Sequence, residues 1–170
     1  MAATKTIAIV GATGKSGTAI AKKLAAVGER VLLISTAKNK LDILGQNIKT
    51  TWPQAIFEII DCAREACWEA DLVILAIPPT AEKEVALKIK EVATQKIVVR
   101  MLPVQSTTSF AANYINELHQ LFPNSKIVTA FINPAALHAT AISGSDEEAV
   151  QTIINIAVKA GFNVAVAAEL

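Results

Sequence analysis

Short apolar runs alternate along this chain with stretches in which apolar residues recur every three or four positions. The runs Ile7–Val10 and Leu72–Ile77 are apolar without interruption, which is typical of strands buried on both faces of a sheet. The amphipathic stretches between such runs are typical of helices that cover a sheet. This alternation predicts an α/β fold with a doubly wound, mostly parallel sheet and helices on both of its faces.

The same pattern gives the expected bounds of the elements. Strands are predicted at Thr6–Val10, Arg30–Ser35, Ala55–Ile60, Asp71–Ile77, Lys96–Met101, Lys126–Ile132, Thr140–Ser143 and Asn163–Ala167. Helices are predicted at Lys15–Val27, Asp61–Ala70, Ala81–Ala93 and Phe110–Leu121, and from the capping box Ser145–Glu148 to Lys159. We expect a helix or turn at Leu41–Asn47, a loop at Lys49–Gln54, and Thr80 as the cap of the helix that follows it. No linker or repeat interrupts this order, so residues 1–170 are predicted to form a single domain.

A glycine-rich turn, Gly11–Gly17, joins the first predicted strand to the first predicted helix. Its glycines follow the spacing G-x-x-G-x-x-G at positions 11, 14 and 17. In such a turn the first glycine permits the tight bend, the second lets backbone approach a ligand, and the third lets the helix pack on the strand. We expect the backbone N–H groups of Gly14, Lys15 and Ser16 to point at an anion, with Thr13 beside them. A dinucleotide pyrophosphate is the preferred ligand.

Two other interpretations of the turn stay open. The letters Gly14-Lys15-Ser16 resemble the end of a nucleoside-triphosphate P-loop, but that motif needs glycine at position 9, where this chain has Ile9. A turn that only connects strand to helix is the other alternative, although three glycines at this spacing exceed what turn geometry needs.

The residues after the second predicted strand indicate which dinucleotide is preferred. Domains that bind NAD place an acidic residue there to hold the ribose hydroxyls. This chain instead has Ser35 and Thr36, and the first acidic residue after the strand is Asp42. Two hydroxyls with the ammonium groups of Lys38 and Lys40 would accept a 2′-phosphate. The sequence therefore predicts NADP as the cofactor, although both lysines could simply be solvated.

Composition narrows the class of protein. The chain has 52% apolar and 18% charged residues and a net charge of +1, which argues against nucleic acid or an anionic membrane as a main partner. No apolar run is long enough to span a membrane and no leader peptide is recognised, so we expect a cytoplasmic location. Cys62 and Cys67 are interpreted as small packing residues, and no metal site is expected.

Taken together, several stretches are similar to the deazaflavin-dependent NADP oxidoreductases and their dinucleotide-binding relatives. They are Thr6–Gly14, Ala70–Pro78, Lys126–Ala135, Ile142–Ala149 and Ala160–Phe162, and the resemblance that rests on them extends over nearly the whole chain. The resemblance implies a Rossmann fold, with NADP(H) lying across the carboxyl ends of the strands and hydride passing to a flat redox partner. It also implies that Ile77 and Pro78 line the cofactor's path, and that Met101–Pro103 and Asn133-Pro134 lie near the nicotinamide.

The chain departs from that family in ways that bear on activity. Thr36 stands where the deazaflavin enzymes have arginine, and the segment before Pro134 lacks their histidine. His138 could face the cleft or the solvent. We therefore expect an NADP(H)-dependent oxidoreductase with a flavin, deazaflavin or metal acceptor as its small-molecule or cofactor partner. An NADP(H)-binding redox sensor without turnover is the alternative. The low charge content also predicts a homodimer.

Overall fold

A single eight-stranded sheet runs through the protein in the order β3-β2-β1-β4-β5-β6-β7-β8. The structure is a computed structural model that describes residues 3–103, 111–133 and 138–166. Its strands are β1 (Thr6–Val10), β2 (Arg30–Ile34), β3 (Phe57–Ile59), β4 (Leu72–Leu75), β5 (Ile97–Pro103), β6 (Lys126–Asn133), β7 (His138–Gly144) and β8 (Ala165–Val166). Its helices are α1 (Lys15–Ala26), α2 (Lys38–Thr51), α3 (Ala63–Glu69), α4 (Pro79–Ile89), α5 (Ala111–Leu121) and α6 (Glu147–Lys159).

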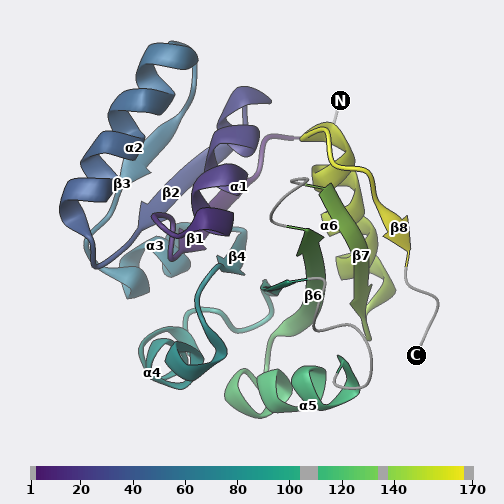
Figure 1. Cartoon of the computed structure of the whole chain (residues 1–170). Coiled ribbons are helices and arrows are strands. Elements are labelled where there is room, and N and C mark those ends of the chain that lie inside the picture. The colour runs from purple at the N-terminus through teal and green to yellow at the C-terminus, as the bar shows by residue number, and fades with distance from the viewer. Residues whose placement is uncertain (1–2, 104–110, 134–137, 167–170) are drawn as a thin grey trace.

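The first six strands of the chain pair in parallel, and the order of the strands reverses at β1. From β1 the chain moves outward to β2 and β3, and then returns to build β4, β5 and β6 on the other side (Figure 1). Strand β7 runs antiparallel to β6, and β8 pairs with β7 in parallel, so these two strands run opposite to the other six. The predicted doubly wound, mostly parallel sheet is therefore confirmed, and a reversal of this kind opens a crevice at the carboxyl ends of β1 and β4.

Two apolar layers hold helices on both faces of the sheet. Buried residues of α1, α2 and α6 pack on one face, and those of α3, α4 and α5 pack on the other. The strands supply both layers because successive side chains alternate between faces: Ile7 and Ile9 belong to the first layer, and Ala8 and Val10 to the second. Strands covered on both sides account for the uninterrupted apolar runs in the sequence.

The helix α2 is longer than the sequence pattern predicted. A helix or turn was expected at Leu41–Asn47 with a loop after it, whereas one helix covers Lys38–Thr51. Its buried residues Leu41, Leu44 and Ile48 recur at helical spacing. Gly45 approaches the Phe57 ring of β3, where an added Cβ would lie 3.2 Å away. Close packing on the sheet therefore stabilises a helix whose composition is largely polar.

Two predicted helix caps were wrong. The cap of α6 is Asp146 rather than Ser145, because the Asp146 carboxylate accepts a hydrogen bond of 2.8 Å from the Ala149 N–H. Helix α4 begins at Pro79, so Thr80 lies inside its first turn and makes no capping bond. Proline suits that first position because its missing N–H would have no helical partner there.

The buried carboxylate of Glu29 joins the start of the chain to the last helix. Glu29 accepts a bond of 2.7 Å from the Lys5 backbone N–H and one of 2.6 Å from Lys159 Nζ in α6. Its side chain is only 3% exposed, so these two donors replace most of its contact with water. Glu29 and Lys159, which are 130 positions apart, are thereby linked at the amino-terminal ends of the strands, opposite the crevice.

Candidate functional site: a glycine-lined cleft

A cleft of about 950 Å³ opens at the carboxyl ends of β1, β2 and β4. This volume lies within the usual range of ligand pockets. Seven of the residues predicted for the cofactor site line it: Gly11, Thr13, Gly14, Ser35, Thr36, Ile77 and Pro78. The structure thus brings together residues that are as far apart in the sequence as Gly11 and Pro78.

The three glycines of the turn have different neighbours. Gly11 has a φ of +85°, and a Cβ there would lie 2.4 Å from the Ala76 carbonyl oxygen. At Gly17 an added Cβ would lie 2.1 Å from the Gly11 carbonyl oxygen, which no real contact permits. At Gly14 the nearest atoms would be 3.5 and 3.7 Å away, and its φ of −70° suits any residue. The free protein itself therefore needs glycine at 11 and 17, whereas nothing in its own packing demands glycine at 14.

Backbone donors surround Gly14. The predicted free N–H of Gly14 was wrong, because it donates to the Gly11 carbonyl at 3.1 Å and closes the turn. Among the residues that the structure describes, none accepts a hydrogen bond from the backbone N–H of Thr13, Lys15 or Ser16. These donors stand at the N-terminus of α1, where the helix dipole favours an anion. A phosphate group fits this site, because it could accept from them and take the space that a Cβ at Gly14 would fill.

Hydroxyl groups tie the glycine turn to the end of β2. Thr13 Oγ1 and Ser35 Oγ lie 2.5 Å apart, and Ser35 Oγ also accepts a bond of 3.1 Å from the Ala37 N–H. Thr36 beside them is exposed at the wall of the cleft. These contacts fix the two turns that would hold opposite ends of an adenosine diphosphate group.

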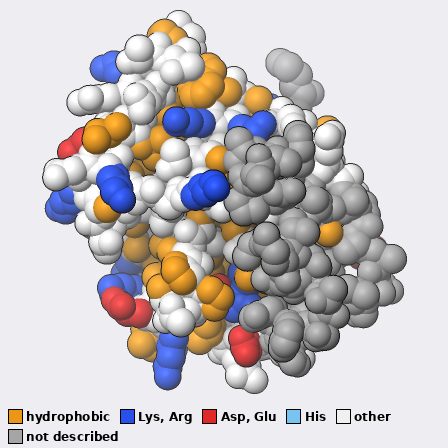
Figure 2. Space-filling view, in the orientation of Figure 1, with side chains coloured by type: hydrophobic (Ala, Val, Ile, Leu, Met, Phe, Trp, Pro, Cys, Tyr) orange, Lys and Arg blue, Asp and Glu red, His pale blue; other side chains and the backbone are white. Residues whose placement is uncertain are grey.

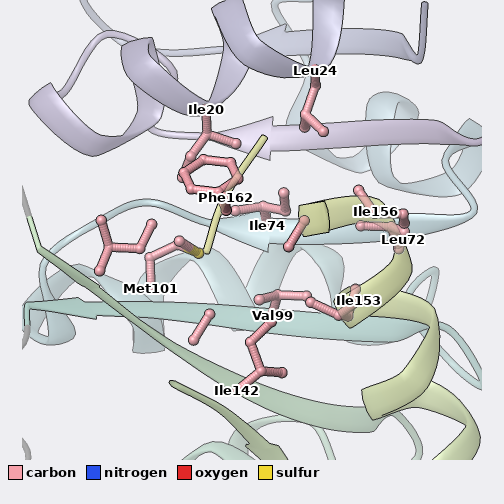
Figure 3. A pocket seen from close by; sticks show the side chains of 13 residues that line it. Ile20, Leu24, Leu72, Ile74, Val99, Met101, Ile142, Ile153, Ile156 and Phe162 are labelled. Carbon is pink, nitrogen blue, oxygen red and sulfur yellow. The ribbon is translucent and has the colours of Figure 1, made fainter. Parts of the chain in front are cut away.

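Five predicted residues do not line the cleft. Lys15 and Ser16 flank it at the start of α1, Gly17 is buried under the turn, and Lys38 stands on the rim with its Nζ 3.4 Å from Asp61 Oδ1. Met101 is different, because its side chain lies on the face of the sheet that α1 and α6 cover. Helix α4, which forms one wall of the cleft, covers the other face. Met101 lines an apolar cavity of about 50 Å³ between α1 and α6, together with Ile20 and Phe162 (Figure 3). Strand alternation explains this, since Val99 and Met101 share one face of β5.

Other predicted residues fall outside what the structure describes. Pro134 lies outside the described residues, and so do the side chains of Asn133 and His138. Within the described ranges, no three metal-ligating side chains come together to hold a metal ion. No helix among the described residues is long and apolar enough to cross a bilayer.

Sequence reasoning missed the far wall of the cleft. Asp61 and Cys62 contribute to it from the turn after β3, Arg64 contributes from α3, and Ala81, Val85 and Lys88 contribute from α4. Asp61 could have been found, because β3 neighbours β2 in the sheet and parallel strands present their carboxyl ends on one edge. The interpretation of Cys62 as a packing residue was wrong, since it is exposed, whereas Cys67 is buried as predicted. Burial raises the pKa of the Cys67 thiol to about 12.

A buried ion pair supports the wall formed by α4. Arg100 Nε of β5 donates a bond of 2.8 Å to Glu82 Oε1 in the first turn of α4, and Arg100 Nη2 donates to Glu82 Oε2. Both side chains are almost inaccessible to water, at 1% and 2% exposure. Burial raises the pKa of the Glu82 carboxyl, and the bond from Arg100 opposes that shift. The pair ties the turn at Ile77-Pro78 and α4 to the neighbouring strand.

The helix that follows the glycine turn is basic. Helix α1 carries Lys15, Lys22 and Lys23 and has no acidic residue, and in Figure 2 the charged side chains over α1 and α2 are mostly blue. A local excess of positive charge attracts anionic ligands even when the net charge of the protein is close to zero. This excess was not apparent from the total of +1.

Comparison with known proteins places the chain in a family. The family model described as NADP oxidoreductase, coenzyme F420-dependent, matches residues 6–103, more than half of the 170 residues. The chain belongs to this family. The predicted resemblance is thereby confirmed, and so is the class of NAD(P)-dependent oxidoreductases with a nicotinamide dinucleotide cofactor. No curated protein sequence matches the chain.

Solved structures share the fold at low sequence identity. A protein of Arthrobacter sp. FB24, provisionally assigned as an F420-dependent NADP reductase, is 20% identical with a TM-score of 0.73, over 95% of this chain and 83% of that one. A pyrroline-5-carboxylate reductase of Coxiella burnetii is 18% identical with a TM-score of 0.76, over 98% and 60% of the two chains. The corresponding reductase of Plasmodium falciparum, solved with NADP bound, is 14% identical with a TM-score of 0.70, over 97% and 58%. The chain therefore spans about three fifths of the length of the two pyrroline reductases.

Proposed function

We propose that this protein binds NADP(H) in the glycine-lined cleft and takes part in hydride transfer to a flavin, deazaflavin or metal-type acceptor. The observation that carries the proposal is the space at Gly14. Among the residues that the structure describes, the nearest atom to an added Cβ would be the Gly11 carbonyl oxygen at 3.5 Å, and the backbone N–H groups of Thr13, Lys15 and Ser16 flank Gly14 in the chain. A pyrophosphate is the group in a dinucleotide that needs such an approach to backbone.

Different residues of the cleft would bind different parts of the dinucleotide. The N–H groups of Thr13, Lys15 and Ser16 would hold the pyrophosphate, and Ser35 and Thr36 would hold the adenosine ribose and its 2′-phosphate. Ile77 and Pro78 would exclude water along the path toward the nicotinamide. Bound NADP(H) supplies the hydride, so the protein itself contributes position and orientation more than an acid or base.

Binding and dinucleotide preference can be tested by titration of the full chain with NADPH and NADH, followed by fluorescence or calorimetry. We expect saturable binding of both, with tighter binding of NADPH. If neither binds, the proposed function is refuted. If NADH binds as tightly as NADPH, only the assignment of Ser35, Thr36 and Lys38 to the 2′-phosphate is wrong.

A second candidate function is NADP(H) binding without turnover, as a sensor or as part of a larger assembly. It is favoured by two departures from the deazaflavin enzymes, Thr36 in place of their arginine and the absence of their histidine before Pro134. Anaerobic mixing of protein and NADPH with flavin, deazaflavin and ferric acceptors distinguishes the two candidates. Clear turnover of any acceptor would exclude the second one.

The remaining proposals concern context. We propose a homodimer, because exposed apolar side chains such as Trp68 (72% exposed) and Val158 (58%) favour association. Light scattering that shows a concentration-independent monomer would refute it. A single domain and a cytoplasmic location stay predictions from the sequence.

A further inference from the structure

Two turns meet at the adenosine end of the cleft and carry opposite charges there. Lys38 is the first residue of α2 after β2, and Asp61 follows β3. Lys38 Nζ lies 3.4 Å from Asp61 Oδ1, and both side chains are largely exposed, at 72% and 76%. Asp61 lines the cleft with Ser35 and Thr36, whereas Lys38 stands on its rim.

These two charges have opposite effects on NADP and NAD. The 2′-phosphate that distinguishes NADP is an anion, so an ammonium group favours it and a carboxylate repels it. A carboxylate instead accepts hydrogen bonds from the free ribose hydroxyls of NAD. In the free protein Asp61 also holds Lys38, so a 2′-phosphate at Ser35 and Thr36 must compete with Asp61 for that ammonium group.

The other charges that line the cleft are already paired. Arg64 Nη1 lies 3.1 Å from Glu91 Oε2, and Lys88 Nζ lies 2.9 Å from Glu84 Oε1. Each of these pairs is close to neutral as a unit. The Lys38–Asp61 pair is the one that stands beside the predicted 2′-phosphate residues, so a change in either of its members alters the charge at that point most directly.

We propose that the Lys38–Asp61 pair sets the preference of the cleft between NADP and NAD. Lys38 raises the preference for NADP, and Asp61 lowers it, by repelling the 2′-phosphate and by withdrawing Lys38 from it. This inference rests on the proposed dinucleotide site. It adds Asp61, an acid outside the usual position after the second strand, as a residue that determines specificity.

The test measures dissociation constants of NADPH and NADH for the full chain and five variants at low ionic strength. The variants are Asp61→Asn, Lys38→Gln, the double variant, and two controls. Glu65→Gln removes an exposed acid of α3 that does not line the cleft, and Lys49→Gln removes an exposed lysine from the far end of α2. The measured quantity is the ratio of NADPH affinity to NADH affinity.

We expect Asp61→Asn to raise this ratio about three- to tenfold, since exposed charge pairs have modest effects. Lys38→Gln should lower the ratio by a similar factor, and Asp61→Asn should change it less when Lys38 is already absent. The controls should leave it within about twofold, and 0.5 M salt should shrink the changes. A ratio that Asp61→Asn leaves unchanged or lowers overturns the inference while the proposed function stands. A chain that binds neither dinucleotide overturns both.

Discussion

Two glycines of the turn, Gly14 and Gly17, should respond to substitution in opposite ways. Gly14→Val places a Cβ and two methyl groups where the pyrophosphate would lie, while its own backbone angles and neighbours allow the change. Gly17→Ala adds a single carbon, but that carbon would lie 2.1 Å from the Gly11 carbonyl oxygen. We therefore expect Gly14→Val to weaken binding with a small effect on the fold, and Gly17→Ala to damage the fold first.

The magnitudes follow from the contacts involved. Loss of one charge-assisted phosphate contact costs about 1.5–3 kcal/mol, which is about a 10- to 200-fold loss of NADPH affinity for Gly14→Val. The same variant loses about 1 kcal/mol of stability, because valine is a poorer N-cap than glycine. The clash at Gly17 should cost about 1–3 kcal/mol or more, since backbone must move to relieve it. For a chain of this length each kcal/mol corresponds to about 2–4 °C in Tm.

Thermal melts of the wild type, Gly14→Ala, Gly14→Val and Gly17→Ala, with and without NADPH, measure both effects together. Ligand at a hundred times its Kd stabilises a protein by about 2.7 kcal/mol, so lost affinity appears as a smaller shift of Tm on adding NADPH. Gly14→Ala should lie between wild type and Gly14→Val. If Gly14→Val keeps the full shift, the turn is only a connection between strand and helix. If Gly14→Val destabilises the free protein as much as Gly17→Ala does, the fold itself needs glycine at 14 and the space there does not indicate a ligand.

Three further variants and reagents test other parts of the structure. Met101→Ala should lower the free energy of unfolding by about 2 kcal/mol, because it enlarges the apolar cavity, and should leave the NADPH titration unchanged; a large loss of affinity would place Met101 at the cofactor after all. A thiol reagent at pH 8 should modify Cys62 alone, because Cys67 is buried with a pKa of about 12, and NADPH should slow that reaction; two fast-reacting thiols in the native protein would contradict this. Arg100→Met should cost about 3–5 kcal/mol in a denaturant titration, because it leaves Glu82 buried without its partner; a loss below 1 kcal/mol would show that the carboxyl is readily neutralised.

The sequence predicted the sheet and the glycine turn well, because each is determined by local patterns. Uninterrupted apolar runs such as Leu72–Leu75 have few alternatives to a buried strand, and the glycine spacing requires a specific backbone geometry. The helix α2 was underestimated because its stability comes from packing on β2 and β3, which propensity does not register.

The errors at the site have local and long-range causes. The Gly14 N–H bonds the carbonyl of Gly11 within the same turn, whereas the position of Asp61 at the wall of the cleft depends on the pairing of β3 with β2. The direction of Met101 depends on the register of β5 in the sheet. The direction of the Met101 side chain therefore becomes apparent only in the three-dimensional structure.

The match to the family model ends at residue 103, but Glu29 has contacts on both sides of that boundary. Glu29 and Lys5 lie in the matched part, and Lys159 lies in the last helix beyond it. Detaching α6 would leave a buried carboxylate with only the Lys5 N–H as a donor, a penalty that opposes partial opening. We therefore expect the amide hydrogens of α6 to exchange with solvent together with those of β1 and β2 in one cooperative event. The folding unit of this chain would then extend beyond residue 103, where the match to the family model ends.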